Sequence, residues 1–162
     1  MRDSDFERLY AEQAGPLLAF LTYRTGDATL AEDVLADAFE RALKARGRFD
    51  PRRASQKTWL YSIALNLLRD SARRKGAEER ALAGAAMRQT VPAGDDALSR
   101  LDDRDQLSRA LDVLSDEERE AVSLRFGADL EVGEIARVLG VRRSTAHGRV
   151  YRALRRLREE LG

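Results

Sequence analysis

The chain has 162 residues, 35% of them charged and only 6% aromatic, with a formal net charge of +1 at pH 7. It has no cysteine and one histidine, which excludes disulfides, thiolate catalysis and zinc sites built from cysteine and histidine. No apolar run approaches the roughly 20 residues of a membrane-spanning helix, so we expect no membrane insertion and a cytoplasmic protein. Since β-branched and aromatic runs are scarce, the composition favours an all-α fold.

Helical periodicity predicts two helices in the first 45 residues, at 4–24 and from Thr29 to Ala45. Pro16 is expected to kink or restart the first of them. The first helix is expected to bury a set of large apolar residues, namely Phe6, Leu9, Tyr10, Leu17, Leu18, Phe20 and Leu21. The apolar side of the second consists of Leu30, Val34, Ala38 and Ala42.

An acidic stripe lies on the other side of the second predicted helix. Asp33, Asp37 and Glu40 recur at helical spacing. One interpretation is a solvated face paired with nearby lysines and arginines. The other is a docking surface for a basic partner. The spacing alone leaves both interpretations open.

A basic loop and a third helix follow. Glycine and proline mark residues 47–55 as the loop, and the helix is predicted from Gln56 to Lys75. Its core face comprises Trp59, Leu60, Ile63, Ala64, Leu67 and Leu68. A second face carries a polar ridge of Ser62, Asn66, Arg69 and Arg73. Beside a basic loop, this ridge suits contact with phosphates and base edges, although a solvated ridge has the same pattern. Trp59 and Tyr61 are interpreted as packing residues.

The helical signal fades beyond residue 80, which predicts two helical domains. We expect an N-terminal domain at 1–80, a flexible linker at 81–96 and a C-terminal domain at 97–162. The second domain should begin with a helix from Leu98 to Leu114. Ser115 and Glu118 then match a capping box, with Ser115 as N-cap and Glu118 reaching back. This box opens a helix that runs through Phe126 and is ended by Gly127.

Two helices separated by a glycine turn are predicted next, as in a helix-turn-helix. The first runs from Val132 to Leu139, and Gly140 ends it in the left-handed conformation. Ser144 or Thr145 is expected to cap the second. The apolar side of this second helix consists of Ala146, Val150, Ala153, Leu154, Leu157 and Leu161. The opposite side carries Ser144, Gly148, Tyr151, Arg152 and Arg155, flanked by Thr145, Arg149 and Arg156.

The second helix is basic along its whole outer side. Seven arginines and no acidic residue occur between Arg142 and Arg158. Gly148 lies in mid-helix, where glycine costs about 1 kcal/mol relative to alanine, so a closely approaching surface would explain it. The pattern predicts a recognition helix for the DNA major groove, although a solvated arginine face is the alternative. The candidate DNA contacts are Arg142, Arg143, Ser144, Thr145, His147, Gly148, Arg149, Tyr151, Arg152 and Arg155.

The N-terminal half resembles the ECF (extracytoplasmic-function) sigma factors, two-domain bacterial transcription-initiation subunits. Residues Leu30–Ala42 (LAEDVLADAFERA) are similar to the family's region 2.2. Residues Thr58–Asp70 (TWLYSIALNLLRD), followed by Arg73 and Arg74, are similar to its regions 2.3 and 2.4.

The C-terminal half resembles region 4 of the same family. Leu114–Leu124 (LSDEEREAVSL) looks like its start. Glu134–Val141 (EIARVLGV), with Thr145, Arg149 and Arg152, looks like its helix-turn-helix. The four blocks occur in the family's order and cover both predicted domains.

The resemblance implies roles for the surfaces described above. Asp33, Asp37 and Glu40 would dock on the clamp helices of the RNA polymerase β′ subunit, and the polymerase's β flap is a further expected contact. The C-terminal recognition helix would read the upstream (−35) promoter element as duplex DNA. The downstream (−10) element would be read, with a flipped base, by Phe49, Arg52, Arg53, Ser55, Gln56, Ser62, Asn66, Arg69 and Arg73. An anti-sigma factor covering the same faces is a further candidate partner.

The chain departs from the family pattern at three places. Ala36 stands where the family usually has glutamine, so one polar contact with the clamp is in doubt. Glu131 stands where a serine or threonine commonly caps the first helix of the motif. The recognition helix reads Ala146-His147-Gly148 in place of a Val-Lys-Ser-like triplet, which weakens the case for a constant phosphate contact at His147.

Two other classes of function were weighed against a sigma factor. A stand-alone helix-turn-helix regulator would normally dimerise on a palindrome, and it needs no second nucleic-acid ridge beside an acidic face. An enzyme is disfavoured because the sequence has no Gly-rich phosphate loop, no nucleophile elbow and no metal-ligand cluster. We therefore predict no catalytic residue, no metal and no cofactor.

Overall fold

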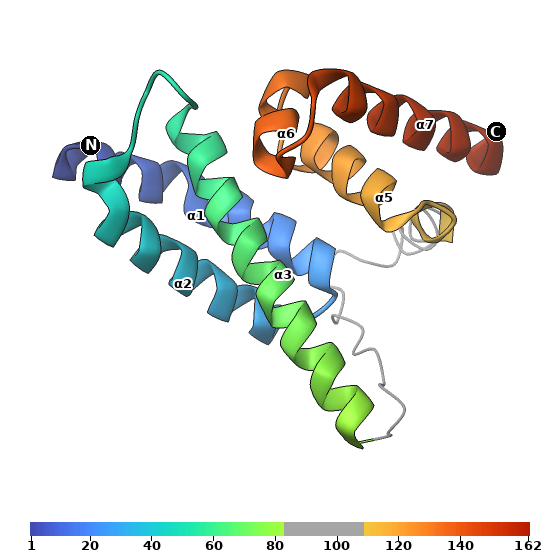
Figure 1. Ribbon diagram of the computed structural model, residues 1–162, viewed down its shortest axis with the longest axis horizontal. Coiled ribbons are helices and arrows are strands. Elements are labelled where there is room, and N and C mark those ends of the chain that lie inside the picture. Colours follow the sequence, from blue (N-terminus) through green and yellow to red (C-terminus); the bar gives the residue numbers. More distant parts are fainter. Residues whose placement is uncertain (83–108) are drawn as a thin grey trace. The chain divides into compact units, whose positions relative to one another are not determined.

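The computed structural model describes residues 1–82 and 109–162, and the chain divides into two units, Met1–Val91 and Pro92–Gly162 (Figure 1). Every regular element within the two described ranges is helical. The all-α prediction is therefore confirmed. Most of the predicted linker at 81–96, and most of the predicted helix from Leu98 to Leu114, lie outside the described residues.

The N-terminal unit consists of three long helices. Helix α1 spans Asp3–Thr25, α2 spans Ala28–Ala45 and α3 spans Gln56–Leu82. Helix α2 packs against both α1 and α3, as Figure 1 shows. Helix α1 continues through Pro16 without a restart, and α3 extends past its predicted end at Lys75.

The sharp connection between α1 and α2 is built by Gly26 and Asp27. Gly26 takes the left-handed conformation (φ 66°), and its amide donates to the Thr22 carbonyl at 2.9 Å, which ends α1. The Asp27 carboxylate accepts from the amides of Thr29 (3.0 Å) and Leu30 (3.2 Å), which caps α2. This short connection brings α2 back along α1.

The core of the N-terminal unit is filled from all three helices. Fully buried large side chains include Leu17, Leu21, Leu60, Leu65 and Tyr61. The Tyr61 ring lies edge-on to Phe20, with 5.5 Å between centroids, so its prediction as a packing residue is confirmed. The prediction for Tyr10 is wrong, because this side chain is 53% exposed and only covers the Phe39 ring from outside (4.8 Å).

The C-terminal unit is assembled from shorter helices around one long one. Residues 109–112 are helical, α5 spans Asp116–Val122, α6 spans Val132–Leu139 and α7 spans Arg143–Leu161. Helix α7 packs against both α5 and α6. Leu111, Leu114, Val122 and Ala153 form a buried cluster, which Leu157 partly covers. Two residues of the predicted apolar side of α7 are not buried, because Leu154 is 40% and Leu161 54% exposed.

The helix that begins with α5 ends at Gly127, as predicted, but its last turn is a π-helix, Ser123–Gly127. The Ala128 amide donates to the Ser123 carbonyl (3.1 Å), which closes this wider turn. Asp129 follows in the left-handed conformation (φ 55°), which aspartate tolerates better than most residues. The chain then enters α6.

Within residues 1–82 and 109–162, no helix has both the length and the apolar character that crossing a membrane would require.

Burial of the Tyr61 phenol makes the stability of the N-terminal unit sensitive to alkaline pH. Burial raises the pKa of Tyr61 to about 12, because the anion would lose its hydration. An unfolded tyrosine ionises near pH 10. The contribution of the neutral Tyr61 side chain to the free energy of unfolding is therefore complete below about pH 10 and is lost as the pH rises towards 12. We expect the free energy of unfolding to fall by up to about 1.4 kcal/mol per pH unit across this window, and Tyr61→Phe to lack this component.

Trp59 is the chain's one tryptophan and lies on α3, so its fluorescence during chemical denaturation reports on this unit. Tyr10→Phe, at an exposed position, is the matched control and should follow the wild-type curve. If the free energy of unfolding of wild type and of Tyr61→Phe fell in parallel from about pH 9 to 11.5, ionisation of Tyr61 could not be the cause of the alkaline destabilisation.

Candidate nucleic-acid interface

Helices α6 and α7 form the predicted helix-turn-helix. Gly140 is left-handed (φ 67°), and the Val141 amide donates to the Ala136 carbonyl at 3.0 Å, so α6 ends as expected. Glu131 precedes α6 without a side-chain cap, as its departure from the family pattern implied. The cap prediction for α7 is wrong, because the N-cap is Arg142 and both Ser144 and Thr145 lie inside the first turn.

The early start of α7 has a plain physical cause. The Arg142 carbonyl accepts from the Ala146 amide (3.0 Å), and Ala146 is fully buried against the rest of the unit. Burial of Ala146 fixes the rotation of the helix, and tertiary packing thereby overrides the local capping preference of Ser144 and Thr145. No side chain caps this end of α7.

One side of α7 is open to solvent and basic, as predicted. The exposed candidate contacts are Arg142, Arg143, Ser144, His147, Tyr151, Arg152 and Arg155. Thr145 and Gly148 are half-buried. The opposite side is closed by Ala146, Val150 and Ala153. The N-terminal half of α7 and its basic face are therefore both open to solvent. These are the parts of a recognition helix that enter the major groove of DNA.

Arg149 differs from the other candidates because it is tied to α5. Its guanidinium Nη2 lies 3.7 Å from Oε2 of Glu117, and only 18% of its side chain is exposed. Glu117 itself is 70% exposed. The sequence carries one signal for this pairing, since the acidic run Asp116–Glu120 and the basic run of α7 occur in the same domain, but it does not specify which residues pair.

A second ion pair joins the same two helices. Arg156 Nε lies 3.5 Å from Oε2 of Glu118, whose side chain is only 8% exposed. Ser115 caps α5 as predicted, accepting from the Glu118 amide at 3.1 Å. Glu118 also reaches back, but its carboxylate accepts from the Ser115 hydroxyl (3.0 Å) and not from the backbone amide of a full capping box.

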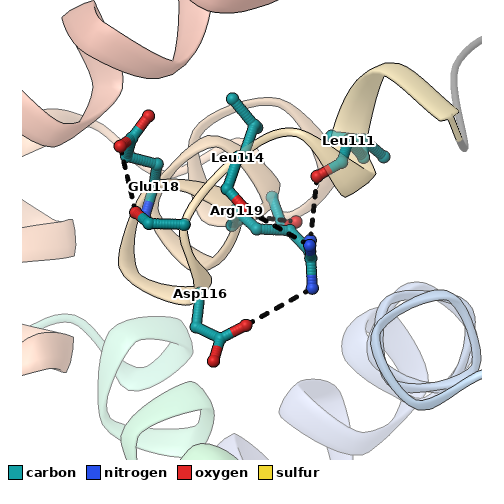
Figure 2. A network of polar contacts seen from close by, with 7 residues as sticks. Leu111, Leu114, Asp116, Glu118 and Arg119 are labelled. Atoms are coloured by element: carbon teal, nitrogen blue, oxygen red, sulfur yellow. Dashed lines mark hydrogen bonds and ion pairs between the residues drawn. The ribbon is translucent and has the colours of Figure 1, made fainter.

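Arg119 fixes the turn that leads into α5 (Figure 2). Its guanidinium donates to the carbonyls of Leu111 (3.1 Å) and Leu114 (3.3 Å), and it lies 3.5 Å from the Asp116 carboxylate. The charge-assisted donors thus satisfy the Leu114 carbonyl and add a second donor to the Leu111 carbonyl, which also accepts from the Leu114 amide at 3.2 Å. This network positions α5, and through the two ion pairs it supports α7.

The basic loop of the N-terminal unit is ordered by its own contacts. The Phe49 ring packs on Trp59, with 5.2 Å between centroids. The Ser55 hydroxyl accepts from the Thr58 amide (3.1 Å), as a helix cap does, at the start of α3. Between these anchors Arg52 and Arg53 are exposed, and Gln56 is half-buried.

The predicted ridge on α3 is only partly open. Asn66 and Arg73 are exposed, whereas Ser62 and Arg69 are half-buried. The Ser62 hydroxyl donates to the Thr58 carbonyl at 2.9 Å, so it is already used inside the helix. Asn66 and Arg73 are therefore the ridge residues most available to a ligand, beside a loop that carries two exposed arginines.

The acidic residues of α2 are all exposed but are not equivalent. Lys44 donates a hydrogen bond to Glu40 at 2.8 Å, and this bond together with the nearby ammonium charge lowers the pKa of Glu40. Within the described residues, the side chains of Asp33 and Asp37 make no ion pair and no hydrogen bond. Asp33 and Asp37 thus carry the charge available to a basic partner. No group of His, Cys, Asp or Glu within the described residues could hold a metal ion.

Family models match both units of the chain. Residues 9–78 match Sigma-70 region 2, and residues 110–159 match Sigma-70 region 4. These ranges contain α2, the basic loop and most of α3 in one unit, and α5, α6 and most of α7 in the other.

Curated relatives match nearly the whole chain. RNA polymerase sigma factor CarQ of Myxococcus xanthus is 33% identical over 97% of this chain and 89% of its own length. ECF RNA polymerase sigma factor SigL of Mycobacterium tuberculosis is 30% identical over 95% of this chain and 89% of its own. ECF RNA polymerase sigma factor BldN of Streptomyces coelicolor is 29% identical over 94% of this chain, which spans 58% of BldN.

Two solved structures share the fold. The sigma factor RpoE from Bartonella quintana, crystallised with the anti-sigma factor NepR, gives a TM-score of 0.81 at 27% identity, covering 98% of this chain and 97% of RpoE. CnrH, in complex with the cytosolic domain of CnrY, gives 0.71 at 26% identity, covering 99% and 89%.

The Arg119 network is expected to stabilise the C-terminal unit. Arg119→Met keeps the aliphatic stem but removes the side-chain donor of the Leu114 carbonyl and the second donor of the Leu111 carbonyl, so the free energy of unfolding of this unit should fall by about 1–3 kcal/mol. Arg137→Met, at an exposed position on α6, is the matched control and should change it by less than about 0.5 kcal/mol. Hydrogen exchange of the α5 and α7 amides measures both, and equal protection in the two variants would refute the role of Arg119.

Proposed function

Because the chain belongs to the ECF family of RNA polymerase sigma factors and directs transcription initiation as an alternative sigma factor, we propose that its two units hold two promoter elements while the first also docks on core RNA polymerase. One observation carries the proposal. Matches to regions 2 and 4 occur in one chain, and each falls on a unit with an exposed basic surface. A single DNA-reading domain would explain only one of these surfaces.

We propose that the polymerase contact is made by Asp33 and Asp37 of α2, with Glu40 beside them. All three are exposed on one side of a helix whose other side is buried, so the acidic face is rigid. The β′ clamp helices are the proposed partner, and the β flap is a second contact of the polymerase. Glu40 contributes less, because Lys44 already partners its carboxylate.

The downstream (−10) element is proposed to bind along the loop and α3 of the first unit. Phe49 and Ser55 anchor the loop at its two ends, which would hold Arg52 and Arg53 in place beside Asn66 and Arg73. Exposed arginines suit phosphates, and an exposed asparagine suits a base edge. A base flipped from the melted strand costs a few kcal/mol of stacking, which contacts in this region would offset.

The upstream (−35) element is proposed to bind as a duplex against the exposed side of α7. Its positive charge supplies affinity through phosphates, and its groove-facing residues supply selectivity. On this basis the functional domains are 1–80 and 97–162, joined by 81–96. The protein acts in the cytoplasm without catalysis or a cofactor of its own.

An anti-sigma factor is a further proposed partner. Both similar structures are complexes, of the sigma factor RpoE with the anti-sigma factor NepR and of CnrH with the cytosolic domain of CnrY. A partner of this kind would cover the acidic face of α2 or the basic face of α7, since either would block the proposed activity.

The direct test mixes the purified chain with core RNA polymerase and transcribes a fragmented genomic library. Stoichiometric binding with new promoter-specific transcripts would support the proposal and supply the promoter sequence. Failure to bind core polymerase, combined with dimeric binding to a palindrome, would replace it with a stand-alone helix-turn-helix regulator.

Charge reversal on α2 should remove polymerase binding without unfolding the chain. Asp33→Lys with Asp37→Lys is expected to weaken the affinity for core polymerase by at least about tenfold, because like charges then meet across the interface. Glu7→Lys with Glu12→Lys, at exposed positions on α1, changes the net charge equally and should bind as wild type. Equal loss in both variants would show a general charge effect and exclude α2 as the docking face.

A further inference from the structure

Arg149 and Arg152 lie close together on α7, yet their surroundings differ. Arg149 is held against α5 by Glu117, with 18% of its side chain exposed. Arg152 is exposed and, within the part of the chain that the structure describes, makes no ion pair. A guanidinium that reads a base must leave its neighbours and present both donors to the groove. Only Arg152 is placed to do so without breaking a contact between helices.

Gly148 lies one turn before Arg152 on the same face. A Cβ built on Gly148 would lie 3.0 Å from Nη1 of Arg152, and 3.6 Å from both Cζ and Nη2. The guanidinium of Arg152 therefore rests over the bare backbone of Gly148 and points towards the N-terminal end of α7. Side chains of helices lean in this direction, and a methyl group at 148 would displace the guanidinium by a few tenths of an ångström.

The glycine is difficult to explain by stability alone. Glycine is among the least favourable residues in a helix interior, and the three atoms nearest to a Cβ at this position all belong to the Arg152 guanidinium. The neighbour that a side chain at 148 would meet is Arg152. The residue at position 148 therefore affects the orientation of the Arg152 side chain more than the packing of the C-terminal unit.

We propose that Arg152, seated on Gly148, is the specificity-determining arginine of α7, whereas Arg149 is a positioning residue that holds α7 against α5. This inference rests on the proposed function and divides the recognition face by role. The chemistry that suits Arg152 is the O6 and N7 edge of a guanine, which a guanidinium binds through two parallel hydrogen bonds. A seat that fixes the guanidinium beforehand reduces the entropy lost on binding.

The test uses holoenzyme made from core RNA polymerase and the full chain, with a panel of single-base-pair changes in the upstream element found by library transcription. Arg152→Ala should reduce discrimination at one G·C pair by about tenfold, the effect of losing one bidentate contact, and should leave the other positions unchanged. Arg149→Ala should lower binding to every panel member by a similar factor, and should reduce hydrogen-exchange protection where α5 meets α7.

A double-mutant cycle tests whether Gly148 positions the Arg152 guanidinium. Gly148→Ala should weaken discrimination at the same G·C pair, by less than Arg152→Ala does, without lowering the stability of the unit. In the Arg152→Ala background, Gly148→Ala should have no further effect on base preference. Gly133→Ala is the control, since α6 leaves open space for a Cβ there and it should not change base preference.

The proposal is overturned if Arg149→Ala shifts base preference while Arg152→Ala does not, or if both variants give the same profile. The role of Gly148 in positioning Arg152 is refuted if Gly148→Ala leaves discrimination at the G·C pair intact, or if it weakens that discrimination by the same factor in the Arg152→Ala background. Absence of promoter-specific transcripts with the wild-type chain would instead refute the proposed function, so the two failures are distinguishable.

Discussion

Helix α7 can present a basic surface only because its other side is buried against α5 and α6. The contact is made by small residues, with Ala146 and Ala153 fully buried and Val150 nearly so. Small side chains allow close approach, so this packing fixes which side of α7 faces the other helices. The packing of these three residues decides which arginines of α7 face solvent.

The electrostatic arrangement follows from that packing. Overall charge is nearly balanced at +1, but acidic and basic residues occupy different segments. Glu117 and Glu118 in the first turn of α5 neutralise Arg149 and Arg156, which lie on the side of α7 that faces α5. Arg155 pairs with Glu159 further along α7. The remaining positive charge is concentrated towards the N-terminal end, where a groove-binding helix makes its base contacts.

Sequence periodicity predicted the helices well, because each long helix has one apolar stripe and clear punctuation at its ends. Gly140 and Ser115 are local signals whose effect does not depend on tertiary structure. The start of α7 was misplaced for the opposite reason. Ser144 and Thr145 are good caps locally, but burial of Ala146 requires the helix to begin earlier.

Residues whose role depends on distant partners could not be predicted. Leu154 and Leu161 fit the apolar stripe of α7, yet α7 has 19 residues while α5 has 7 and α6 has 8. Within the described residues the shorter helices therefore leave parts of that stripe uncovered. Likewise the sequence places Arg152 on the outer side of α7 and Arg149 on its flank, but it does not show that Glu117 holds Arg149 against α5.

The division into two units has a consequence for how selectivity arises. With much of its charge paired internally, α7 offers a modest electrostatic attraction to DNA, and the loop and α3 ridge of the other unit are also limited in extent. Neither surface alone has the charge of a strong DNA-binding domain. When polymerase holds both units on one promoter, the second contact becomes intramolecular and gains from a high effective concentration. Weak individual surfaces then favour sites where both elements are present at the correct spacing, which is the discrimination that a promoter-selecting subunit requires.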